Sequence, residues 1–282
     1  MKLITQVETD RLPVGISLSD KIIVLGSCFA DEIGKRMEVC GFDVCINPFG
    51  TLYNPASIAD ALERLEHGKP FVPEDCTPMG AGAGLFCSFH HHTSFARKTP
   101  DEFLQNANSK LEEASGFWHS CNKVIVTLGT AMVWKHDGMT VSNCLKRPAA
   151  EFTHEMMGIG EAAEKVERIC RSCGKRGVIL TVSPIRHLSG GAHTNTLSKA
   201  TLQLAADDSV SKGHACYFPA YEILNDELRD YRFYAEDLCH PSSTAIEYIW
   251  ERFTDVAVPA DERDRMHMNE KAARRSAHRP IH

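Results

Sequence analysis

Two possible nucleophiles, Ser27 and Cys28, stand side by side directly after an apolar run at residues 21–25. A serine or cysteine nucleophile needs a base that takes its proton, a group that orients the base, and donors for the developing oxyanion. Asp237 and His240 lie three residues apart near the other end of the chain, just before an expected helix. With this spacing in a turn, the carboxylate can hold one imidazole nitrogen while the other nitrogen faces the nucleophile. Asp237 and His240 could also simply cap the following helix. Acyl-transfer chemistry is indicated only because they occur together with the Gly-Ser that follows the first strand.

Short apolar runs that alternate with helical patterns must position these residues. Strands are expected at residues 21–25, 42–46, 123–128 and 178–182, with a weaker fifth strand at 216–219. Helices are expected at residues 29–40, 55–65, 101–117, 160–171, 194–206 and 242–253. Uninterrupted apolar strands that alternate with helices indicate a parallel sheet covered on both faces. We therefore predict an α/β fold, a three-layer flavodoxin-like sandwich around a mostly parallel five-stranded sheet.

Polar residues follow each of the first four expected strands. In parallel α/β sheets the ligand site lies beyond the carboxyl ends of the strands, so these residues should converge there. They are Ser27, residues 47–50, Gly129 with Thr130, and Ser183 with Arg186 and His187.

Two stretches break the alternation, and a charged tail follows it. Residues 76–97 include a glycine-rich and histidine-rich segment, and residues 131–145 include Asp137-Gly138, a hairpin signal. We interpret both as loop or hairpin insertions at the rim of the site, within one domain of residues 1–258. Residues 259–282 are expected to form a charged C-terminal helix or arm.

The overall composition argues against several classes of protein. The 282 residues are 43% hydrophobic and 24% charged, as in ordinary globular domains. A net charge of -6 gives no general attraction to nucleic acid or to anionic lipid. We expect a cytoplasmic protein, because the first residues lack the apolar core of a signal peptide and no apolar run is long enough to span a membrane. The 11 cysteines are scattered and fit reduced thiols.

No metal or cofactor is expected from the sequence. His90, His91 and His92 are consecutive, so an extended backbone would point them to opposite faces, and no matching ligand spacing follows. Cys170 and Cys173 form a lone C-x-x-C pair, whereas zinc needs four ligands. The glycine-rich segment also lacks the Lys-Ser/Thr ending of a phosphate loop.

Five ordered blocks give the chain a resemblance to a known family. The blocks are GSCFADEIG near the start, then NPFGTLYNP, TLGTAMVW and SPIRH, and DLCHPS near the end. In them the chain resembles the GSCFA family and, through it, the SGNH/GDSL hydrolase superfamily. The resemblance implies Ser27 as the nucleophile, Asp237 and His240 as acid and base, and the backbone amides of Ser27 and Gly50 as oxyanion donors.

The third block departs from the pattern of the wider superfamily. At this block the wider superfamily has a motif that looks like Gly-x-Asn. This chain has Gly129-Thr130-Ala131 there, so an asparagine donor is missing. We expect Thr130 to supply the third oxyanion donor because it stands at a strand end, with Asn47 or Asn54 as substitutes. A weakened oxyanion hole also fits a slower or non-hydrolytic enzyme.

Cys28 is the alternative nucleophile. It stands in the first turn of an expected helix, where the helix dipole lowers a thiol pKa. We nevertheless expect Ser27 to react, because the resemblance places it facing the strand ends and leaves Cys28 to packing. Only one of two adjacent side chains is expected to reach the base.

Together these residues predict a serine esterase that cleaves a short O-acyl ester, such as an acetyl ester, on a carbohydrate or another small polar substrate. Substrate contacts are expected from Asn47, Asn54, His92, Arg186 and His187. For Arg186 and His187, pairing with acidic residues on the neighbouring loop is an equal alternative. Two alternatives stay open: an O-acyltransferase that uses the same residues, and a catalytically silent module that binds a glycan or a partner. The acyl group, the alcohol and the oligomeric state are not predicted.

Overall fold

A five-stranded parallel sheet forms the centre of the fold. The computed structural model describes residues 4–277. The sheet contains β1 (Lys21–Gly26), β2 (Asp43–Ile46), β5 (Lys123–Leu128), β9 (Gly177–Val182) and β10 (Cys216–Tyr217). These strands pair in the order β10-β9-β5-β1-β2, and each pairing is parallel. The predicted α/β class and five-stranded sheet are confirmed.

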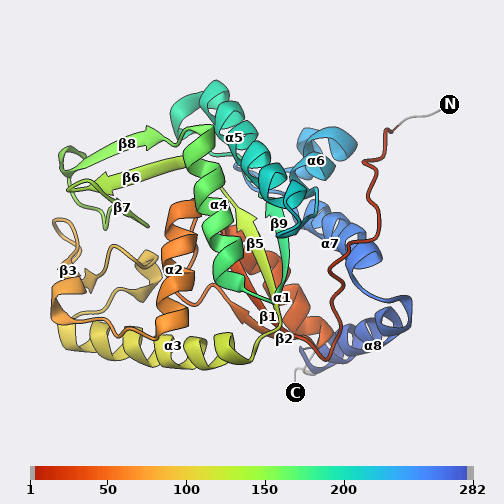
Figure 1. The fold of residues 1–282 in the computed structure, drawn as a ribbon, viewed down its shortest axis with the longest axis horizontal. Coiled ribbons are helices and arrows are strands. Elements are labelled where there is room, and N and C mark those ends of the chain that lie inside the picture. Colours follow the sequence, from red (N-terminus) through yellow and green to blue (C-terminus); the bar gives the residue numbers. More distant parts are fainter. Residues whose placement is uncertain (1–3, 278–282) are drawn as a thin grey trace, which may run out of the picture.

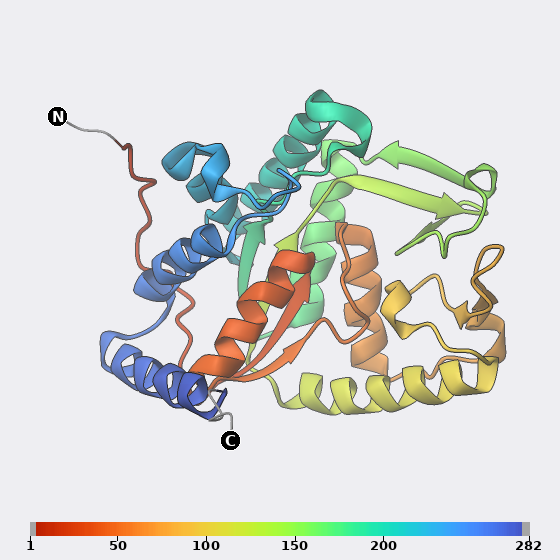
Figure 2. The same cartoon turned by 180° about the vertical axis from the view of Figure 1, so that it is seen from behind.

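Helices cover both faces of this sheet (Figures 1 and 2). One face carries α1 (Cys28–Cys40), α7 (Ser243–Ala257) and α8 (Ala260–Ala277). The other face carries α2 (Pro55–His67), α3 (Pro100–Ser120), α4 (Ile159–Cys173) and α5 (Gly191–Ser211). A short helix, α6 (Ala220–Glu222), runs directly into a π-helical turn (Ile223–Leu228). The arrangement is the predicted three-layer sandwich.

Strand β1 shows how the sequence fills the two halves of the core. Ile23 and Leu25 face the cluster beneath α2, α3, α4 and α5, whereas Ile22 and Val24 face the cluster beneath α1 and α7. All four side chains are fully buried. A strand covered on both faces needs apolar residues at every position, which is why this segment has no polar alternation.

Helix α2 begins as the sequence predicts. Asn54 caps it, because its side chain accepts a hydrogen bond from Ser57 N at 2.9 Å, and Pro55 occupies the first helical position. Proline is favoured there because its missing N–H would have no partner in the helix. This cap fixes Asn54 beside the carboxyl edge of the sheet.

The two interrupting stretches form small antiparallel structures. The first contains β3 (Thr77–Pro78) paired with β4 (Phe86–Cys87). The second contains β6 (Met132–His136) and β7 (Met139–Val141), and these pair with β8 (Phe152–Met156) in the order β7-β6-β8. Figure 1 shows this small sheet at one end of the molecule, away from α7 and α8. Strand β8 was not predicted, because its middle residues Thr153, His154 and Glu155 are polar and exposed and only pairing with β6 makes them extended.

Part of the predicted C-terminal arm is the helix α8, which packs against α1. Met266 is buried in the core cluster of that face, and Asn269 donates to the Cys40 carbonyl at 2.9 Å. The last part of this prediction, residues 278–282, lies outside the described residues. None of the helices in residues 4–277 has the length and apolar character needed to cross a membrane.

Candidate active site

Cys28 meets His240 at the carboxyl edge of the parallel sheet. Cys28 is the first residue of α1, immediately after β1, and its side chain is partly exposed. Its Sγ lies 3.5 Å from His240 Nε2, within reach of a sulfur hydrogen bond. A thiol and an imidazole from positions 212 residues apart are thus brought into contact.

Asp237 holds the other nitrogen of the same imidazole. His240 Nδ1 and Asp237 Oδ2 lie 2.5 Å apart, and both side chains are half exposed. Asp237 Oδ1 also accepts hydrogen bonds from the backbone amides of Cys239 and His240, each at 2.9 Å. Hydrogen bonds to these two amides and to the imidazole lower the pKa of Asp237 to about 2. The carboxylate therefore stays ionised at neutral pH and fixes His240 with Nε2 directed at the sulfur.

The loop that carries Asp237 and His240 is held by Arg186, which follows β9. The Arg186 amide donates to the Cys239 carbonyl and its Nη1 donates to the Leu238 carbonyl, both at 3.0 Å. Leu238 has a φ of 56°, a left-handed conformation that costs a non-glycine residue energy. Arg186 thus stabilises a strained turn between the carboxylate and the imidazole. The sequence suggested either a substrate contact for Arg186 or pairing with acidic residues on a neighbouring loop; in the structure, Arg186 contacts a neighbouring loop through the backbone carbonyls of that loop.

Ser27, the expected nucleophile, is fully buried and does not meet the base. Its Oγ accepts from Phe29 N at 3.3 Å and so caps α1. A Cβ atom added at Gly129 would lie 3.3 Å from Ser27 Cβ, so the backbone after β5 covers this serine closely. This geometry does not fit Ser27 as the predicted nucleophile, because of the two adjacent side chains Cys28 faces His240 and Ser27 faces inward. The helix cap is the physical reason, because it commits the Ser27 hydroxyl to the start of α1.

The predicted oxyanion amides are also occupied. Ser27 N donates to the Thr127 carbonyl at 3.2 Å, continuing the pairing of β1 with β5. Gly50 N donates to the Asn47 carbonyl at 2.7 Å, and Thr130 N donates to the Tyr53 carbonyl at 2.8 Å. The Thr130 hydroxyl accepts from Met132 N at 3.1 Å and meets Ser198 Oγ at 2.9 Å.

Two other groups are candidate donors to an oxyanion. The amide of Cys28 is the first of α1, and first-turn amides have no acceptor within their own helix. Asn54 lines the pocket beside Cys28. Because Asn54 uses Oδ1 for the helix cap, its Nδ2 group is left to donate elsewhere. The cap role of Asn54 was read from the sequence, and the pocket position makes it a candidate donor.

The remaining predicted substrate residues divide into two groups. Asn47 is buried and supports the backbone, since it accepts from Gly26 N at 2.8 Å and donates to Asp31 at 2.6 Å. His92 contacts Ser94 through Nδ1 at 3.1 Å and is not among the residues that line the pocket. His187, like Arg186 and Asn54, does line it.

The pocket beside Cys28 has a volume of about 520 Å³. Tyr53 follows β2, Trp134 and His154 belong to the small antiparallel sheet, and residues from the start of α5 close the opposite side. Trp134 and His154 stack with ring centroids 3.9 Å apart. Arg186 is the one Asp, Glu, Lys or Arg side chain among the lining residues. The pocket therefore combines an aromatic wall with amide and hydroxyl groups and has no carboxylate, which fits a neutral or anionic polar ligand.

His187 remains neutral in this pocket. Burial lowers its pKa to about 4, and the neighbouring Lys199 and His240 act in the same direction. Its Nε2 atom is buried and has no hydrogen-bond partner within the described residues. Its ring packs edge-on against Tyr53 at 5.7 Å. A neutral imidazole with a free nitrogen can hydrogen-bond a bound ligand.

Lys199 supports the floor of the site and was not predicted. Its side chain is almost fully buried in α5, and Nζ donates to the carbonyls of Gly129 at 2.6 Å and Ser183 at 2.8 Å. Burial lowers its pKa to about 7. These carbonyls end the strands β5 and β9, so Lys199 ties together the two strand ends nearest the pocket. The residues around Lys199 are mostly polar, so no sequence signal marked this lysine as buried.

The Cys28 thiol is not ionised in advance. Burial raises its pKa, nearby Asp31 and Glu32 act in the same direction, and the backbone amides of Cys28 and Phe29 oppose them. The helix dipole that favours a thiolate is therefore outweighed by desolvation. A reaction at this sulfur needs His240 to remove the proton as the new bond forms.

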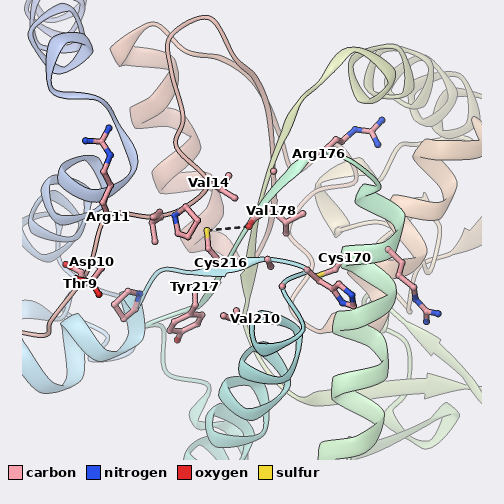
Figure 3. A pocket seen from close by; sticks show the side chains of 18 of the residues that line it. Thr9, Asp10, Arg11, Val14, Cys170, Arg176, Val178, Val210, Cys216 and Tyr217 are labelled. Carbon is pink, nitrogen blue, oxygen red and sulfur yellow. Dashed lines mark hydrogen bonds between the residues drawn. The ribbon is translucent and has the colours of Figure 1, made fainter.

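A second region of the molecule offers a larger cavity, of about 990 Å³, at the amino ends of β9 and β10 (Figure 3). Its walls come from the extended N-terminal segment, the end of α4 and the start of β9. Cys216 lies in it, but its thiol donates to the Val178 carbonyl at 3.6 Å, and burial raises its pKa. The neighbouring Cys170 has its pKa raised to about 11, again by burial. His214 also lines this cavity, but within residues 4–277 neither thiol has a hydrogen bond to a histidine or a carboxylate, in contrast to Cys28 in the smaller pocket.

Metal ligands do not gather anywhere in residues 4–277, since no three His, Cys, Asp or Glu side chains lie together in a metal-binding arrangement. His91, from the histidine run, is fully buried and bonds Ser88 Oγ at 2.7 Å. Burial lowers its pKa to about 3, and its ring packs against Phe71 and Phe95. This histidine belongs to the core beneath the β3–β4 insertion.

Two comparisons with known proteins bear on identity. A sorbitol dehydrogenase of Bombyx mori is 26% identical over 140 residues, which is 43% of this chain and 39% of that protein. The chain thus spans well under half the length of that relative, at an identity that shows no shared activity. The GSCFA family matches residues 21–253, a range that runs from the start of β1 into α7 and includes Cys28, Asp237 and His240. The chain belongs to the GSCFA family.

Proposed function

We propose that this protein is an acyl-transfer enzyme in which Cys28, and not Ser27, forms the covalent intermediate. The observation that carries the proposal is the chain of contacts from Cys28 Sγ to His240 Nε2 and from His240 Nδ1 to Asp237. A nucleophile within reach of a base that is oriented by a third group is the general signature of covalent catalysis. The pocket beside the sulfur supports the same reading, because a substrate can reach the thiol from it.

The first half of the reaction acylates the sulfur. Cys28 Sγ attacks the carbonyl carbon of an ester while His240 Nε2 takes the thiol proton. Asp237 stabilises the imidazolium that forms, since it already holds Nδ1. The Cys28 amide and Asn54 Nδ2 are our candidate oxyanion donors. When the intermediate collapses, His240 returns the proton to the leaving alcohol and a thioester remains on Cys28.

The second half releases the acyl group. An acceptor molecule gives its proton to His240 and attacks the thioester carbonyl, and the sulfur leaves as a thiolate that His240 reprotonates. Water as acceptor gives hydrolysis, and a bound alcohol or amine gives transfer. In either case the acceptor must enter beside His240, where the half-exposed imidazole leaves room.

This proposal retains the resemblance to SGNH/GDSL hydrolases but moves the nucleophile by one residue. The sulfur of Cys28 would take the position that the sequence assigned to the Ser27 hydroxyl. The first residue of α1 projects toward the strand ends, whereas the preceding cap residue turns inward. Short-chain O-acyl esters of carbohydrates or similar polar molecules stay our proposed substrates, and the aromatic and amide lining supports that class.

The test is acyl-enzyme trapping with peptide mapping. The protein is mixed with 4-nitrophenyl acetate, quenched in acid, digested and analysed by mass spectrometry. We expect a 42 Da acetyl adduct (roughly, for one acetyl group replacing a proton) on Cys28, formed in a burst of nitrophenol release. An adduct on Ser27 would restore the serine mechanism. No adduct on either residue, with an intact fold, would favour a silent binding module.

A further inference from the structure

A second pocket touches the same sulfur and imidazole from the opposite side. It has a volume of about 380 Å³ and shares Cys28, Ile185 and His240 with the first pocket. Its other walls come from α1 and from the start of α7, which lie on the same face of the sheet. Hydrolysis needs one substrate pocket and a water molecule, whereas the reacting pair here stands between two cavities.

The charges of the two pockets differ. The first pocket carries Arg186 and no carboxylate. The second pocket carries Glu32 and Arg36 from α1. Arg36 is already paired with Glu247 at 2.5 Å, so its charge is compensated. Glu32 has Lys35 as its cationic neighbour, at 3.8 Å and with both side chains exposed to solvent, which is a weak interaction.

Glu32 stands one helical turn after Cys28 on α1, so its carboxylate and the sulfur lie on the same side of the helix. Burial is the main cause of the raised pKa of Cys28, and Asp31 and then Glu32 act in the same direction, which fits the position of Glu32 near the sulfur. A cationic group bound by Glu32 would be held beside the thioester. Phe29, Ile246 and Pro241 give the lining an apolar part that suits a short alkyl chain, and Ser243 adds a hydroxyl.

We propose that this second pocket is an acceptor site for small molecules with two amino groups, and that the enzyme passes its acyl group to one of their amines. This rests on the proposed function, because it requires an acyl group on Cys28. Glu32 binds one ammonium group. The other amine, in its neutral form, attacks the thioester carbonyl, and its proton goes to His240 Nε2. The carbon–sulfur bond breaks, an amide forms, and His240 returns the proton to the Cys28 thiolate.

A thioester suits this acceptor. Sulfur donates less electron density to the carbonyl than oxygen does, so thioesters react much faster with amines than oxygen esters do. The sequence-based choice of a serine gave no reason to expect an amine, since a serine acyl-enzyme is an oxygen ester. The assignment of Cys28 in place of Ser27 as the nucleophile and the presence of the second pocket therefore both favour transfer of the acyl group to an amine.

The experiment compares three acceptors that share one attacking amine but differ in the tail. Wild-type protein is incubated with 4-nitrophenyl acetate and 1,4-diaminobutane, 4-amino-1-butanol or 4-aminobutanoate, whose tails are cationic, neutral and anionic. The ratio of N-acetyl product to free acetate is measured by mass spectrometry. This ratio reports on the partition of the acyl-enzyme and is independent of how fast the acyl-enzyme forms.

We expect the transfer ratio for 1,4-diaminobutane to exceed that for 4-aminobutanoate by about tenfold or more, the effect of one charge-assisted contact. Glu32→Gln should reduce this preference to within about threefold. Glu38→Gln is the matched control, because Glu38 is an exposed carboxylate on the same helix and lines neither pocket.

Three outcomes separate this inference from the proposed function. An acetyl adduct on Cys28 with acetate as the sole product would leave the acyl-enzyme standing and overturn the acceptor site. Equal transfer to the three amines, or a cationic preference unchanged in Glu32→Gln, would also overturn it. Absence of any Cys28 adduct would instead refute the proposed function.

Discussion

The pockets at the two edges of the sheet contain similar groups but differ in how their cysteines are placed. The pocket at the amino edge is the larger and contains Cys216, whose thiol donates a hydrogen bond to a backbone carbonyl. The pocket at the carboxyl edge is smaller and contains Cys28, whose sulfur meets an imidazole. Volume therefore does not identify the pocket in which a thiol meets an imidazole. A thiol becomes a candidate nucleophile when a base reaches it and a third group fixes that base.

The same lesson holds at closer range for Ser27 and Cys28. Both are polar, adjacent and near the helix start, yet the cap commits one of them to α1 and leaves the other at the pocket. The two positions have different consequences when changed: loss of the cap should affect stability, and loss of the sulfur should affect chemistry. Substitutions of Cys28, Cys216 and Ser27 therefore test whether the two pockets, and the two adjacent residues, differ as the structure indicates.

The largest expected effect is that of Cys28→Ala on the turnover of 4-nitrophenyl acetate. We expect a loss of roughly three or more orders of magnitude, because the remaining catalysis must rely on oxyanion donors and binding. Cys216→Ala is the matched control and should change the turnover by less than about threefold, since that thiol donates to a backbone carbonyl and not to an imidazole. Steady-state kinetics with both variants checks the comparison, and equal losses would refute it.

A smaller effect is expected for Asp237→Asn. The amide can no longer stabilise an imidazolium, and the orientation of His240 is weakened, so we expect a loss of about 100-fold or more in acylation rate. Burst kinetics measures this rate directly. A variant that acylates as fast as the wild type would mean that the contact between Asp237 and His240 is merely a turn contact.

Arg186→Ala should reduce acylation by about tenfold, the effect of losing one charged hydrogen bond that holds the Leu238 turn. Arg186→Lys can still donate to that carbonyl and should recover most of the rate. Free guanidinium added to Arg186→Ala should restore part of it. If substrate binding were the main role of Arg186, KM would change in the alanine variant and the burst rate at saturation would not.

The pH dependence of alkylation tests the state of the sulfur. Because burial raises the pKa of Cys28, the thiol form dominates at neutral pH and the thiolate fraction grows as the pH rises. The rate of Cys28 modification by iodoacetamide, followed by peptide mass spectrometry, should therefore still be increasing at pH 9. A rate that levels off near pH 6 or 7 would indicate a preformed thiolate and would contradict the assignment of His240 as a general base.

The smallest effect on activity is expected for Ser27→Ala. Loss of the cap should lower the free energy of unfolding by about 1 kcal/mol, and turnover should stay within about tenfold of the wild type. Thr99→Ala is the matched control, because Thr99 caps α3 through Glu102 N and does not line the pocket beside Cys28. Denaturant unfolding and esterase assays on both variants check this. A selective loss of activity in Ser27→Ala would bring the serine back as the nucleophile.

The local sequence was sufficient to predict most of the fold. The strand at residues 123–128 was predicted with its observed bounds, and the helix after Asn54 with its cap and first residue, because apolar runs and capping residues act over a few positions. The convergence of strand ends followed from the parallel sheet. The small sheet was only half expected, since β8 is extended through pairing with β6 and its own residues carry little strand signal.

The sequence by itself determined which residue types stand near the site: a serine beside a cysteine, and an aspartate three residues before a histidine. The tertiary structure alone decided which neighbour faces the base, because that depends on where α1 begins relative to a loop some 200 residues away. It also decided that the amides of Ser27, Gly50 and Thr130 are used by the backbone. A hydrogen-bond donor serves only one partner well at a time, and which partner it has is a property of the packed chain.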